Sequence, residues 1–449
     1  MNVKDLIFWS KNKLLRHKAV CQYKTALQNQ TKSIEELKKL NWEKRCDIVN
    51  YAYNNISFYK DFYDSKGFNP SDLKKEKDWE KVPILPKKLV RENIEIIKNQ
   101  NISKKYIGIA TTGGSTGLPL KIYTDKRFNW EVLGWRMFKQ WDVSPADNVG
   151  IIHRRVPTTF FGKFKNRALW WPTKRAYLNA SSMNEEEIRN FVNEIISKKI
   201  IWLQGYVGGL EKVADYINTH NITITTLRLV WSTSAPLIDN VRLKMVRAFN
   251  CKIMNQYGSN EFPNIAMQCK DSDDLHINYD SVHIDILSNN KYVTDEEGDI
   301  LVTCFENKAF PLIKYEIGDR GTISSISCKC GNPLPQLKRI KGRTSDSVYT
   351  PSGRYIDGNY LTCLFDDYPT IFDQFQVYQT KDYSLDIRVK IYKDNVETKK
   401  ALDTIKRTLE AKVNNEIPVS ISIVNHINDD KGKIRYIISE IALDKIKNN

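Results

Sequence analysis

The sequence predicts an α/β protein with a large N-terminal domain and a small α+β C-terminal domain. Between about residues 105 and 340, short apolar runs typical of buried strands alternate with amphipathic helical patterns. The last hundred residues instead follow one strand–helix–strand order. With 449 residues, of which 41% are hydrophobic and 27% charged, the chain can bury such a core, and this composition excludes a disordered or fibrous protein.

Residues 1–100 are expected to be mostly helical and basic, interrupted by Pro83–Pro86, because proline does not fit a helix interior. Residues 1–18 break their apolar runs with charge, which predicts a helix packed on the body rather than a signal peptide; contact with a membrane surface is the alternative. No stretch approaches the roughly 20 apolar residues of a membrane span. We therefore expect a cytoplasmic protein with at most peripheral membrane contact.

The α/β region contains several clear elements. The runs VGIIH (149–153) and RLVWSTS (228–234) predict buried strands. A helix is expected over 184–198, with a capping box of Ser182 and Glu185, and a second over 238–249. The first helix is predicted to bury one apolar face, made of Ile188, Phe191, Val192, Ile195 and Ile196.

The C-terminal region has its own pattern. SLDIRVKIY (384–392) alternates, with Leu385, Ile387, Val389 and Ile391 on one face. A helix over 396–413 and the alternating run PVSISIV (418–424) follow. We place the domain boundary near 342–346, which gives domains 1–342, with 1–100 as a helical lead-in, and 343–449.

The net charge indicates the class of binding partner, and the number of cysteines indicates the redox compartment. Lys and Arg total 69 against 53 Asp and Glu, a formal charge of +16, which predicts an anionic partner: a nucleotide, coenzyme, nucleic acid, acidic carrier or membrane surface. Because the basic residues are spread along the chain, a nucleic-acid partner is disfavoured. Eight cysteines are too few for a disulfide scaffold and favour a reducing compartment.

Four potential metal ligands have suggestive spacing. Cys269 and His276 are followed about fifty residues later by Cys328 and Cys330. Three thiolates and one imidazole form a tetrahedral set typical of closed structural zinc sites, with free buried thiols as the alternative, and the single histidine disfavours iron–sulfur. The other cysteines are interpreted as isolated small apolar residues: Cys21, Cys46, Cys251, Cys304 and Cys363.

The segment 111–119, TTGGSTGLP, follows the apolar run IGIA and precedes the strand-like LKIYT. Its glycines and hydroxyls allow a sharp turn that brings N–H and O–H donors to an anion, so it is suited to phosphates. It lacks the lysine of a Walker loop and the spacing of a Rossmann fingerprint. A flexible hairpin turn is the alternative.

This loop resembles the phosphate-binding loop of the adenylate-forming (acyl-activating) superfamily, in its phenylacetate–CoA ligase and CapK-like branch. Further segments match in the same order: YGSNE (257–261), YEIGDR (315–320), RIKGR (339–343) with Asp346, and GKIR (432–435). IVNYAYNNISFYKDFY (48–63) and VPILPKKLVREN (82–93) resemble the N-terminal region of the CapK-like group, and the cysteine–histidine spacing is similar to its pattern.

The resemblance implies a large adenylate-forming domain and a small mobile lid that carries a catalytic lysine. The implied reaction activates a carboxylic acid with ATP as an acyl-adenylate and releases pyrophosphate. Transfer follows, to a thiol of coenzyme A or a carrier protein, or to an amine or hydroxyl of a glycan precursor, with capsular or exopolysaccharide biosynthesis as the implied setting. The alternative from another class is a non-catalytic, zinc-stabilised module that binds nucleotide or nucleic acid, which the charge of +16 motivates.

The resemblance also assigns roles to residues. Lys433 and Glu261 would be catalytic, with Lys431 as the rival lysine and Glu261 also holding Mg²⁺. The cofactors implied are ATP, Mg²⁺, structural Zn²⁺ and, as one acceptor, coenzyme A. Nucleotide would be bound by Thr112, Gly113, Gly114, Ser115, Thr116, Gly117, Ser234, Ala235, Tyr257, Gly258, Asp319 and Arg343.

Some features depart from the family pattern or vary within it. Ser345 stands where an acid is common at the hinge, which leaves the pivot open between Ser345 and Asp346. The segment 232–237 lacks the frequent acidic residue. Acid-pocket residues do not transfer. His153 is a candidate because it follows a buried strand, and Tyr206 in LQGYVGGL is a second one, with core or surface packing as the alternative.

Overall fold

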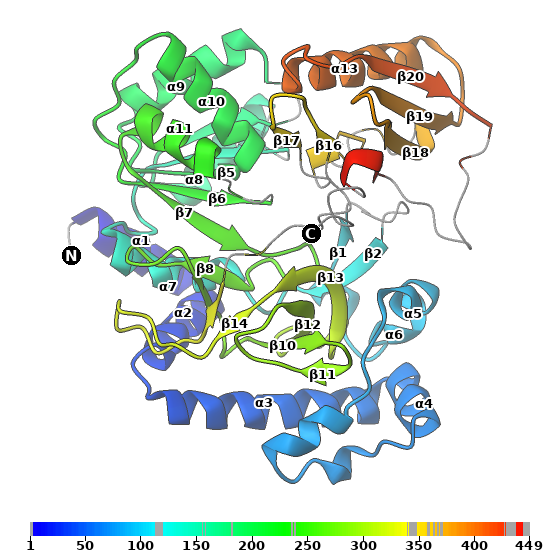
Figure 1. Ribbon diagram of the computed structural model, residues 1–449. Helices are drawn as coiled ribbons and strands as arrows, with labels where there is room; N and C mark the ends of the chain where they lie inside the picture. Colours follow the sequence, from blue (N-terminus) through cyan, green and yellow to red (C-terminus); the bar gives the residue numbers. More distant parts are fainter. Residues whose placement is uncertain are drawn as a thin grey trace. The chain divides into compact units, whose positions relative to one another are not determined.

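The computed structural model shows an α/β chain, as predicted, that divides into two compact units (Figure 1). It describes residues 3–112, 120–154, 156–157, 159–180, 183–234, 237, 239–338, 340, 348–356, 360–361, 364–365, 368, 371–425, 427 and 437–442. Unit 1 comprises residues 1–110 with 122–340, and unit 2 comprises 111–121 with 341–449. The predicted boundary between 342 and 343 lies outside the described residues and stays a prediction, as does the mobility of the lid.

Helices make up most of the first hundred residues, which confirms the prediction. They are α1 (Val3–Leu15), α2 (His17–Asn29), α3 (Ile34–Asn55), α4 (Ser57–Ser65), α5 (Lys87–Glu92) and α6 (Ile94–Ile97), with 3₁₀ turns η1 (Pro70–Asp72), η2 (Glu76–Lys81) and η3 (Lys104–Tyr106). Pro83–Pro86 lies outside any helix, and Leu85 pairs with Tyr315. Phe8 is buried against Trp135, so α1 packs on the body as expected. Within the described residues, no helix combines the length and apolar character needed to cross a membrane.

A nine-stranded sheet forms the centre of unit 1, in the order β14-β15-β9-β8-β7-β6-β5-β3-β4. Its strands are β3 (Val149–His153), β4 (Arg175–Asn179), β5 (Trp202–Tyr206), β6 (Leu229–Thr233), β7 (Lys252–Tyr257), β8 (Ala266–Gln268), β9 (Leu275–Ile277), β14 (Ile323–Ser324) and β15 (Gln336–Leu337). The five strands from β4 to β7 are parallel, and the pairs from β7 to β14 are antiparallel. The two strands predicted from VGIIH and RLVWSTS are confirmed as β3 and β6.

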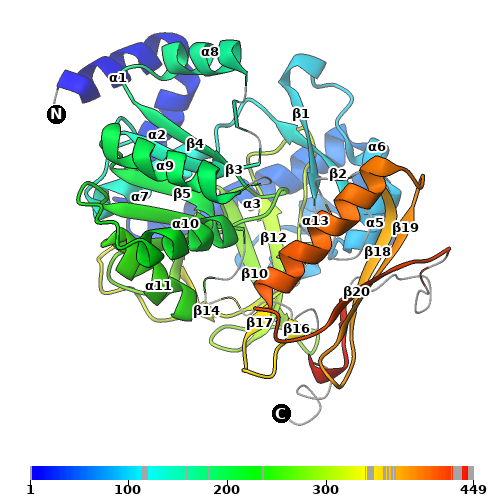
Figure 2. The ribbon, with the colours of Figure 1, turned by 90° about the horizontal axis from the view of Figure 1, so that it is seen from above.

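Helices pack on both faces of this sheet. The helices of unit 1 that follow the N-terminal region are α7 (Glu131–Phe138), η4 (Lys139–Trp141), α8 (Phe160–Trp170), α9 (Glu185–Ser197), α10 (Val207–Thr219) and α11 (Asp239–Phe249). α9, α10 and α11 lie side by side (Figure 2) and share a core with Ile152 and Leu203. The neighbouring Trp202 belongs to a second core, with Phe8 of α1 and Phe138 of α7. Consecutive strand residues point to opposite faces, so these cores lie on opposite sides of the sheet.

Two details of the sequence prediction for α9 are wrong. The N-cap is Asn184, whose side chain accepts from the Glu187 amide while Glu187 reaches back, so the capping box is Asn184–Glu187 rather than Ser182–Glu185. Ile196 is 47% exposed instead of buried, because its position on the helix lies beyond the face that contacts the core. The other four residues of the predicted face are buried.

A second sheet of unit 1 has the order β11-β10-β12-β13 and is antiparallel. Its strands are β10 (Val282–Ser288), β11 (Lys291–Tyr292), β12 (Gly298–Cys304) and β13 (Tyr315–Gly321). The helix α3 contacts this sheet, and its Asn41 donates to the carbonyls of Tyr279 and Val282. The strands predicted on either side of the glycine-rich segment are confirmed as β1 (Ile107–Thr112) and β2 (Leu120–Asp125), which pair with each other.

Unit 2 contains the predicted strand–helix–strand order. Its elements are β16 (Val348–Tyr349), β17 (Tyr355–Ile356), β18 (Phe372–Gln379), β19 (Leu385–Ile391), α13 (Val396–Lys412), β20 (Val419–Ile423) and β21 (Ile437–Ser439). The sheet order is β20-β19-β18-β21. Leu385, Ile387 and Val389 are buried in a core shared with α13, whereas Ile391 is only partly buried.

A candidate nucleotide site and a candidate metal centre

Four neighbouring parallel strands bring candidate residues to one edge of the large sheet. His153 ends β3, Tyr206 ends β5, Ser234 follows β6 and Tyr257 ends β7. In parallel α/β sheets, ligands bind at the carboxyl ends of the strands. Ser234 has φ of 75°, a backbone conformation that non-glycine residues adopt rarely and that is enriched at functional sites. Ser234 and Tyr257 therefore lie at the same end of the sheet.

The two weak candidates for the acid pocket lie together. The His153 and Tyr206 rings have centroids 5.0 Å apart, because their strands β3 and β5 are hydrogen-bonded neighbours. The Arg154 guanidinium lies 5.8 Å from the centroid of the Tyr206 ring. A cation above an aromatic ring beside an imidazole is a setting that suits a carboxylate. Sequence reasoning did not single out Arg154.

The Tyr257 hydroxyl donates to Oδ2 of Asp319 at 2.8 Å. Tyr257 belongs to the large sheet and Asp319 to β13 of the second sheet, so this bond joins two predicted nucleotide-binding motifs that lie far apart in the sequence. Gly258 comes next, where a Cβ would approach the Pro263 carbonyl oxygen to 2.6 Å. The tight turn after Tyr257 therefore requires glycine.

Glu261 is buried and faces two groups that the sequence did not link to it. The Tyr315 hydroxyl donates to Oε1 of Glu261 at 3.3 Å, and Lys87 Nζ lies 3.6 Å from the same oxygen. Lys87 also donates to the Ile317 carbonyl at 3.5 Å. A buried carboxylate without a partner is costly, so Lys87 offsets the charge of Glu261.

Sequence reasoning missed Lys87, although its segment VPILPKKLVREN was noted for its resemblance. The sequence does not show that the backbone of this segment pairs with β13. Leu85 N donates to the Lys314 carbonyl at 3.0 Å, and Glu316 N donates to the Leu85 carbonyl at 3.1 Å. This pairing spans more than two hundred residues of sequence and places Lys87 beside the YEIGDR motif.

Several predicted site residues lie outside the described residues. They are Gly113, Gly114, Ser115, Thr116 and Gly117 of the loop, Ala235, Arg343, Ser345 and Asp346 of the hinge, and both lysines, Lys431 and Lys433. Thr112 ends β1, and only its backbone is described. Their roles stay predictions.

The four predicted metal ligands converge. The ligand atoms of Cys269, His276, Cys328 and Cys330 all lie within 4.8 Å of one another. Cys269 directly follows β8, His276 lies on the adjacent β9, and the two other cysteines precede β15, which pairs with β9. Burial raises the pKa of the Cys269 thiol to about 12 and lowers the pKa of His276.

Two of the separations between these ligand atoms match those expected around a tetrahedral zinc ion. Bond lengths of about 2.3 Å to sulfur and about 2.0 Å to nitrogen place ligand atoms about 3.8 Å apart for two sulfurs and about 3.5 Å for sulfur and nitrogen. The separations are 3.7 Å from Cys269 Sγ to Cys328 Sγ and 3.3 Å from Cys330 Sγ to His276 Nε2. His276 Nδ1 lies 2.9 Å from the Leu334 carbonyl oxygen, the partner that leaves Nε2 facing the cysteines.

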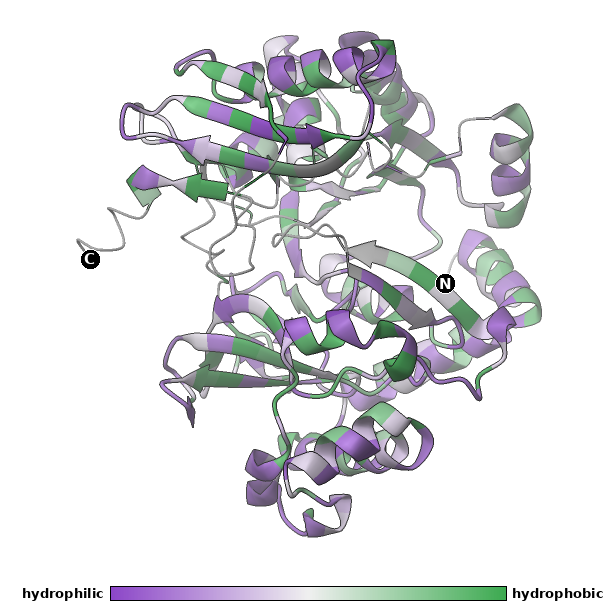
Figure 3. Ribbon diagram, turned by 90° about the vertical axis from the view of Figure 1, so that its right-hand side faces the viewer, coloured by the Kyte–Doolittle hydropathy of each residue, from purple (hydrophilic) through white to green (hydrophobic). Residues whose placement is uncertain are grey.

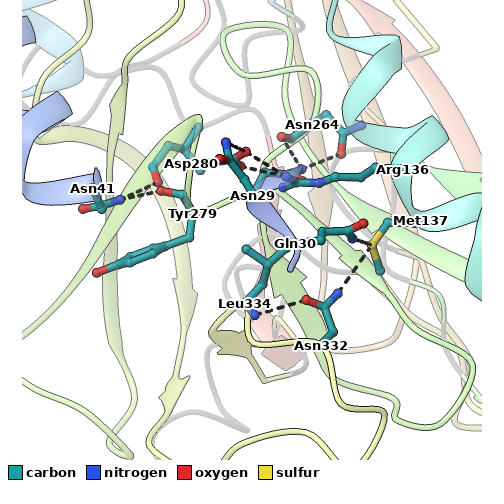
Figure 4. Close-up of polar contacts among 12 residues, drawn as sticks. Asn29, Gln30, Asn41, Arg136, Met137, Asn264, Tyr279, Asp280, Asn332 and Leu334 are labelled. Atoms are coloured by element: carbon teal, nitrogen blue, oxygen red, sulfur yellow. Dashed lines mark hydrogen bonds and ion pairs between the residues drawn. The ribbon is translucent and has the colours of Figure 1, made fainter. Parts of the chain in front are cut away.

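A buried polar layer next to this cluster connects it to the N-terminal helices (Figure 4). Arg136 of α7 donates to both carboxylate oxygens of Asp280 at 2.8 and 2.9 Å and also to Asn278. Asn29 of α2 donates to Asp280 as well, at 2.8 Å. The backbone N–H of Asn332 donates to Cys330 Sγ, and its side-chain Nδ2 lies against the sulfur of Met137. The cluster and the helical lead-in thus share one network.

The remaining cysteines follow the prediction in part. Cys304 is buried, and Cys46 and Cys251 are partly buried, as expected of small apolar residues. Cys21 is exposed, which corrects the prediction; it lies on the outer side of α2, near the His17 ring. Cys363 lies outside the described residues.

Comparisons with known proteins agree with these observations. Residues 348–440 match the model of the CapK C-terminal domain. Protein CapK of Staphylococcus aureus is 24% identical, over 67% of this chain and 66% of that protein. Phenylacetate-coenzyme A ligase of Escherichia coli K12 is 22% identical, over 71% of this chain and 74% of that protein.

Among solved structures, 2-hydroxyisobutyryl-CoA ligase in complex with 2-HIB-AMP and CoA has a TM-score of 0.64 at 18% identity, over 93% of both chains. The same enzyme in its postadenylation state gives 0.61 at 16% identity, over 94% of this chain and 93% of that chain. At this identity the likeness establishes the fold.

Proposed function

The chain belongs to the CapK and phenylacetate–CoA ligase family of the adenylate-forming superfamily, as a homologue of AMP-forming acid–CoA ligases, and from this premise we propose that it activates a carboxylic acid with ATP. A carboxylate oxygen of the substrate attacks the α-phosphorus of ATP, the bond between the α-phosphorus and the bridging oxygen breaks, and pyrophosphate leaves. A thiol or another nucleophile then attacks the acyl carbon, and AMP departs. The membership favours this enzyme over a non-catalytic module.

One observation carries the proposal. The hydrogen bond from Tyr257 to Asp319 brings the YGSNE and YEIGDR motifs to a single place, beside the carboxyl ends of the parallel strands. Tyr257 offers a ring for the adenine, and a carboxylate such as Asp319 accepts two hydrogen bonds from the cis-diol of a ribose. Two motifs from different sheets meet here, as a shared nucleotide would require.

Glu261 is proposed to hold Mg²⁺, which prefers oxygen ligands and binds together with substrate phosphates. Glu261 supplies the oxygen ligands of this kind, on a buried carboxylate four residues after Tyr257. A bound divalent ion supplies charge that stabilises the departing phosphates. Lys87 then acts as a positioning residue, since its ammonium group, 3.6 Å from Oε1, orients the buried carboxylate.

The remaining predicted site residues, most of them outside the described ranges, complete the proposal. Thr112 to Gly117 would cradle the terminal phosphates, and Ser234 and Ala235 would contact the base. Arg343 would lie at the hinge, and Lys433, with Lys431 as its rival, would bridge the carboxylate and the α-phosphate as charge develops between them. A lysine suits that place because its compact charge sits on a long stem.

Zinc is proposed as a structural cofactor. Cys269, His276, Cys328 and Cys330 would hold it, and four protein ligands leave no open position for catalysis. The ion would fix the strands β8 and β9 against the segment that enters β15. No step of the reaction depends on it.

For the acyl acceptor and the pathway we propose classes rather than single compounds. Coenzyme A, a carrier-protein thiol, or an amine or hydroxyl of a glycan precursor would take the acyl group, and a role in capsular or exopolysaccharide biosynthesis follows from the likeness to the CapK branch. The net charge of +16 suits coenzyme A and acidic carriers equally.

Acid-dependent exchange of labelled pyrophosphate into ATP tests the activation step, with a panel of aryl, fatty and amino acids. We expect one acid class to support exchange in the wild type. Glu261→Gln and Asp319→Asn should lower the rate by about 100-fold or more, as typical for lost electrostatic or positioning groups. Tyr257→Phe removes only the hydroxyl.

The matched control is Tyr292→Phe, which also deletes a tyrosine hydroxyl, in this case the partner of Lys314 Nζ at 2.6 Å, away from the proposed site. Its exchange rate should equal that of the wild type. If no acid supports exchange, or if Glu261→Gln and Asp319→Asn exchange at the wild-type rate, the proposed function is wrong.

A further inference from the structure

Helix α8 places large apolar side chains in solvent. None of its residues is buried, and Phe160, Phe161 and Phe164 are 89%, 74% and 63% exposed. Trp171, directly after the helix, is 57% exposed. Single exposed apolar residues are ordinary in soluble proteins, but a contiguous group of large aromatic ones marks an interaction surface.

The C-terminal end of α8 is attached to α1. Lys11 Nζ donates to the Ala168 and Trp171 carbonyls at 2.8 and 2.9 Å, and the Arg16 guanidinium lies 4.9 Å from the centroid of the Trp170 ring. Figure 2 shows α1 and α8 together at one edge of unit 1. The α1–α8 surface comprises Leu14, Leu15, Phe160, Phe161, Phe164 and Trp171, all more than half exposed.

This surface is also strongly basic. From Phe160 to Lys174 the sequence has four basic residues, all exposed, and no acidic one: Lys163, Lys165, Arg167 and Lys174. Apolar and polar residues alternate accordingly along the sequence of α8, and Figure 3 colours the ribbon by hydropathy. Aromatic residues interleaved with lysines are the composition of helices that lie in the interface of a membrane.

The positive charge of the α1–α8 surface favours one class of binding partner over another. A second copy of this chain would bring the same cations against each other, in a protein that already carries +16. Anionic lipid headgroups instead neutralise the cations, while phenylalanine and tryptophan rings enter the boundary between headgroups and acyl chains. Both features of the surface are then satisfied by one partner.

We propose that the α1–α8 surface docks unit 1 on an anionic lipid bilayer. The contact is peripheral, because within the described chain no helix is able to cross a membrane. The inference is independent of the proposed function, since it involves none of the residues assigned to ATP, the acid or zinc. It would place the activation reaction next to substrates or acceptors held in a membrane.

Cosedimentation of the purified full chain with lipid vesicles tests the proposal. The vesicles contain phosphatidylcholine alone or phosphatidylcholine mixed with phosphatidylglycerol. We expect binding to the anionic vesicles that weakens with added salt, and little binding to neutral ones. The triple variant Phe160→Ser, Phe161→Ser, Phe164→Ser should bind at least about tenfold more weakly, since each ring contributes buried apolar area.

Charge variants provide the matched comparison. Lys163→Glu with Lys165→Glu should weaken binding about 25-fold or more, because each basic residue near an anionic surface contributes about fivefold. Lys60→Glu with Lys77→Glu changes the net charge by the same amount at exposed positions elsewhere in unit 1, and it should bind nearly as well as the wild type. Unchanged thermal melting and ATP binding verify that each variant is folded.

Two results would overturn the inference. One is a wild-type protein that ignores anionic vesicles at low salt, or a serine variant that binds them as tightly as the wild type. The other is a dimer in solution, measured by light scattering, that becomes monomeric in the serine variant; the surface would then be an interface between two copies.

Discussion

The buried pair of Arg136 and Asp280 offers a quantitative test of the structure. Arg136 is almost completely buried, and its Nη1 contacts both oxygens of Asp280. Asp280→Asn removes the negative charge but keeps the size of the side chain, so Arg136 is left as a buried cation without a counter-ion. Removing one partner of such a pair costs about 3–5 kcal/mol of folding free energy.

The double variant separates the pair from its surroundings. Arg136→Met with Asp280→Asn leaves no unpaired charge, so it should be less destabilised than the sum of the two single changes by at least about 2 kcal/mol. Urea unfolding followed by tryptophan fluorescence measures these values. All ten tryptophans lie before residue 232, so the signal reports on unit 1.

The pair also predicts an acid dependence. Burial alone would raise the pKa of Asp280, but Arg136 and the Asn29 amide outweigh it and hold the pKa below its usual value. The stabilisation is therefore present above about pH 4 and is lost as the pH falls through the lowered pKa. Asp280→Asn should flatten this part of the pH profile.

The double-variant experiment would refute the reasoning if the destabilisations of the two single variants were additive, with a coupling energy within about 0.5 kcal/mol of zero.

Three further predictions follow from other parts of the chain. Protein purified without added zinc should contain about one zinc per chain, and Cys328→Ser should lose it and melt at a lower temperature; a stable, metal-free wild type would contradict the cluster. Burial lowers the pKa of Lys314 to about 8, so the free energy of unfolding should rise by roughly 3 kcal/mol between about pH 8 and pH 10.5, and Lys314→Met should abolish that rise in urea titrations. His153→Ala and Tyr206→Ala should raise the KM for the acid in the exchange assay but leave the KM for ATP unchanged; equal changes in both would remove these residues from the acid pocket.

The elements that sequence predicted well are those with one dominant period. α11, α13, β3, β6, β19 and β20 each have a single apolar face or a short buried run, so the pattern allows one interpretation. The start of α9 was predicted wrongly because the sequence offers two candidate capping boxes that are offset by only two residues. Local chemistry does not distinguish Ser182–Glu185 from Asn184–Glu187, and packing on the core selects the second.

The candidate site shows a different limit. The resemblance of short motifs predicted roles for Tyr257, Glu261 and Asp319, and ligand spacing predicted the four metal ligands, because short segments carry both signals. It did not reveal Lys87 or Arg154, whose relevance depends on pairing between distant strands. Long-range partners such as Leu85 with Lys314 leave no periodic trace in either segment.

The strand order of the large sheet has a consequence for how this protein can change. The residues proposed for the acid end β3 and β5, whereas those proposed for the nucleotide follow β6 and β7. Neighbouring strands are about 4.8 Å apart, so the outermost members of the two groups are separated by about 14 Å. Substitutions confined to β3 and β5 would thus retune which acid is accepted while the ATP-handling half keeps its geometry, a modular arrangement that both natural divergence and directed evolution can exploit.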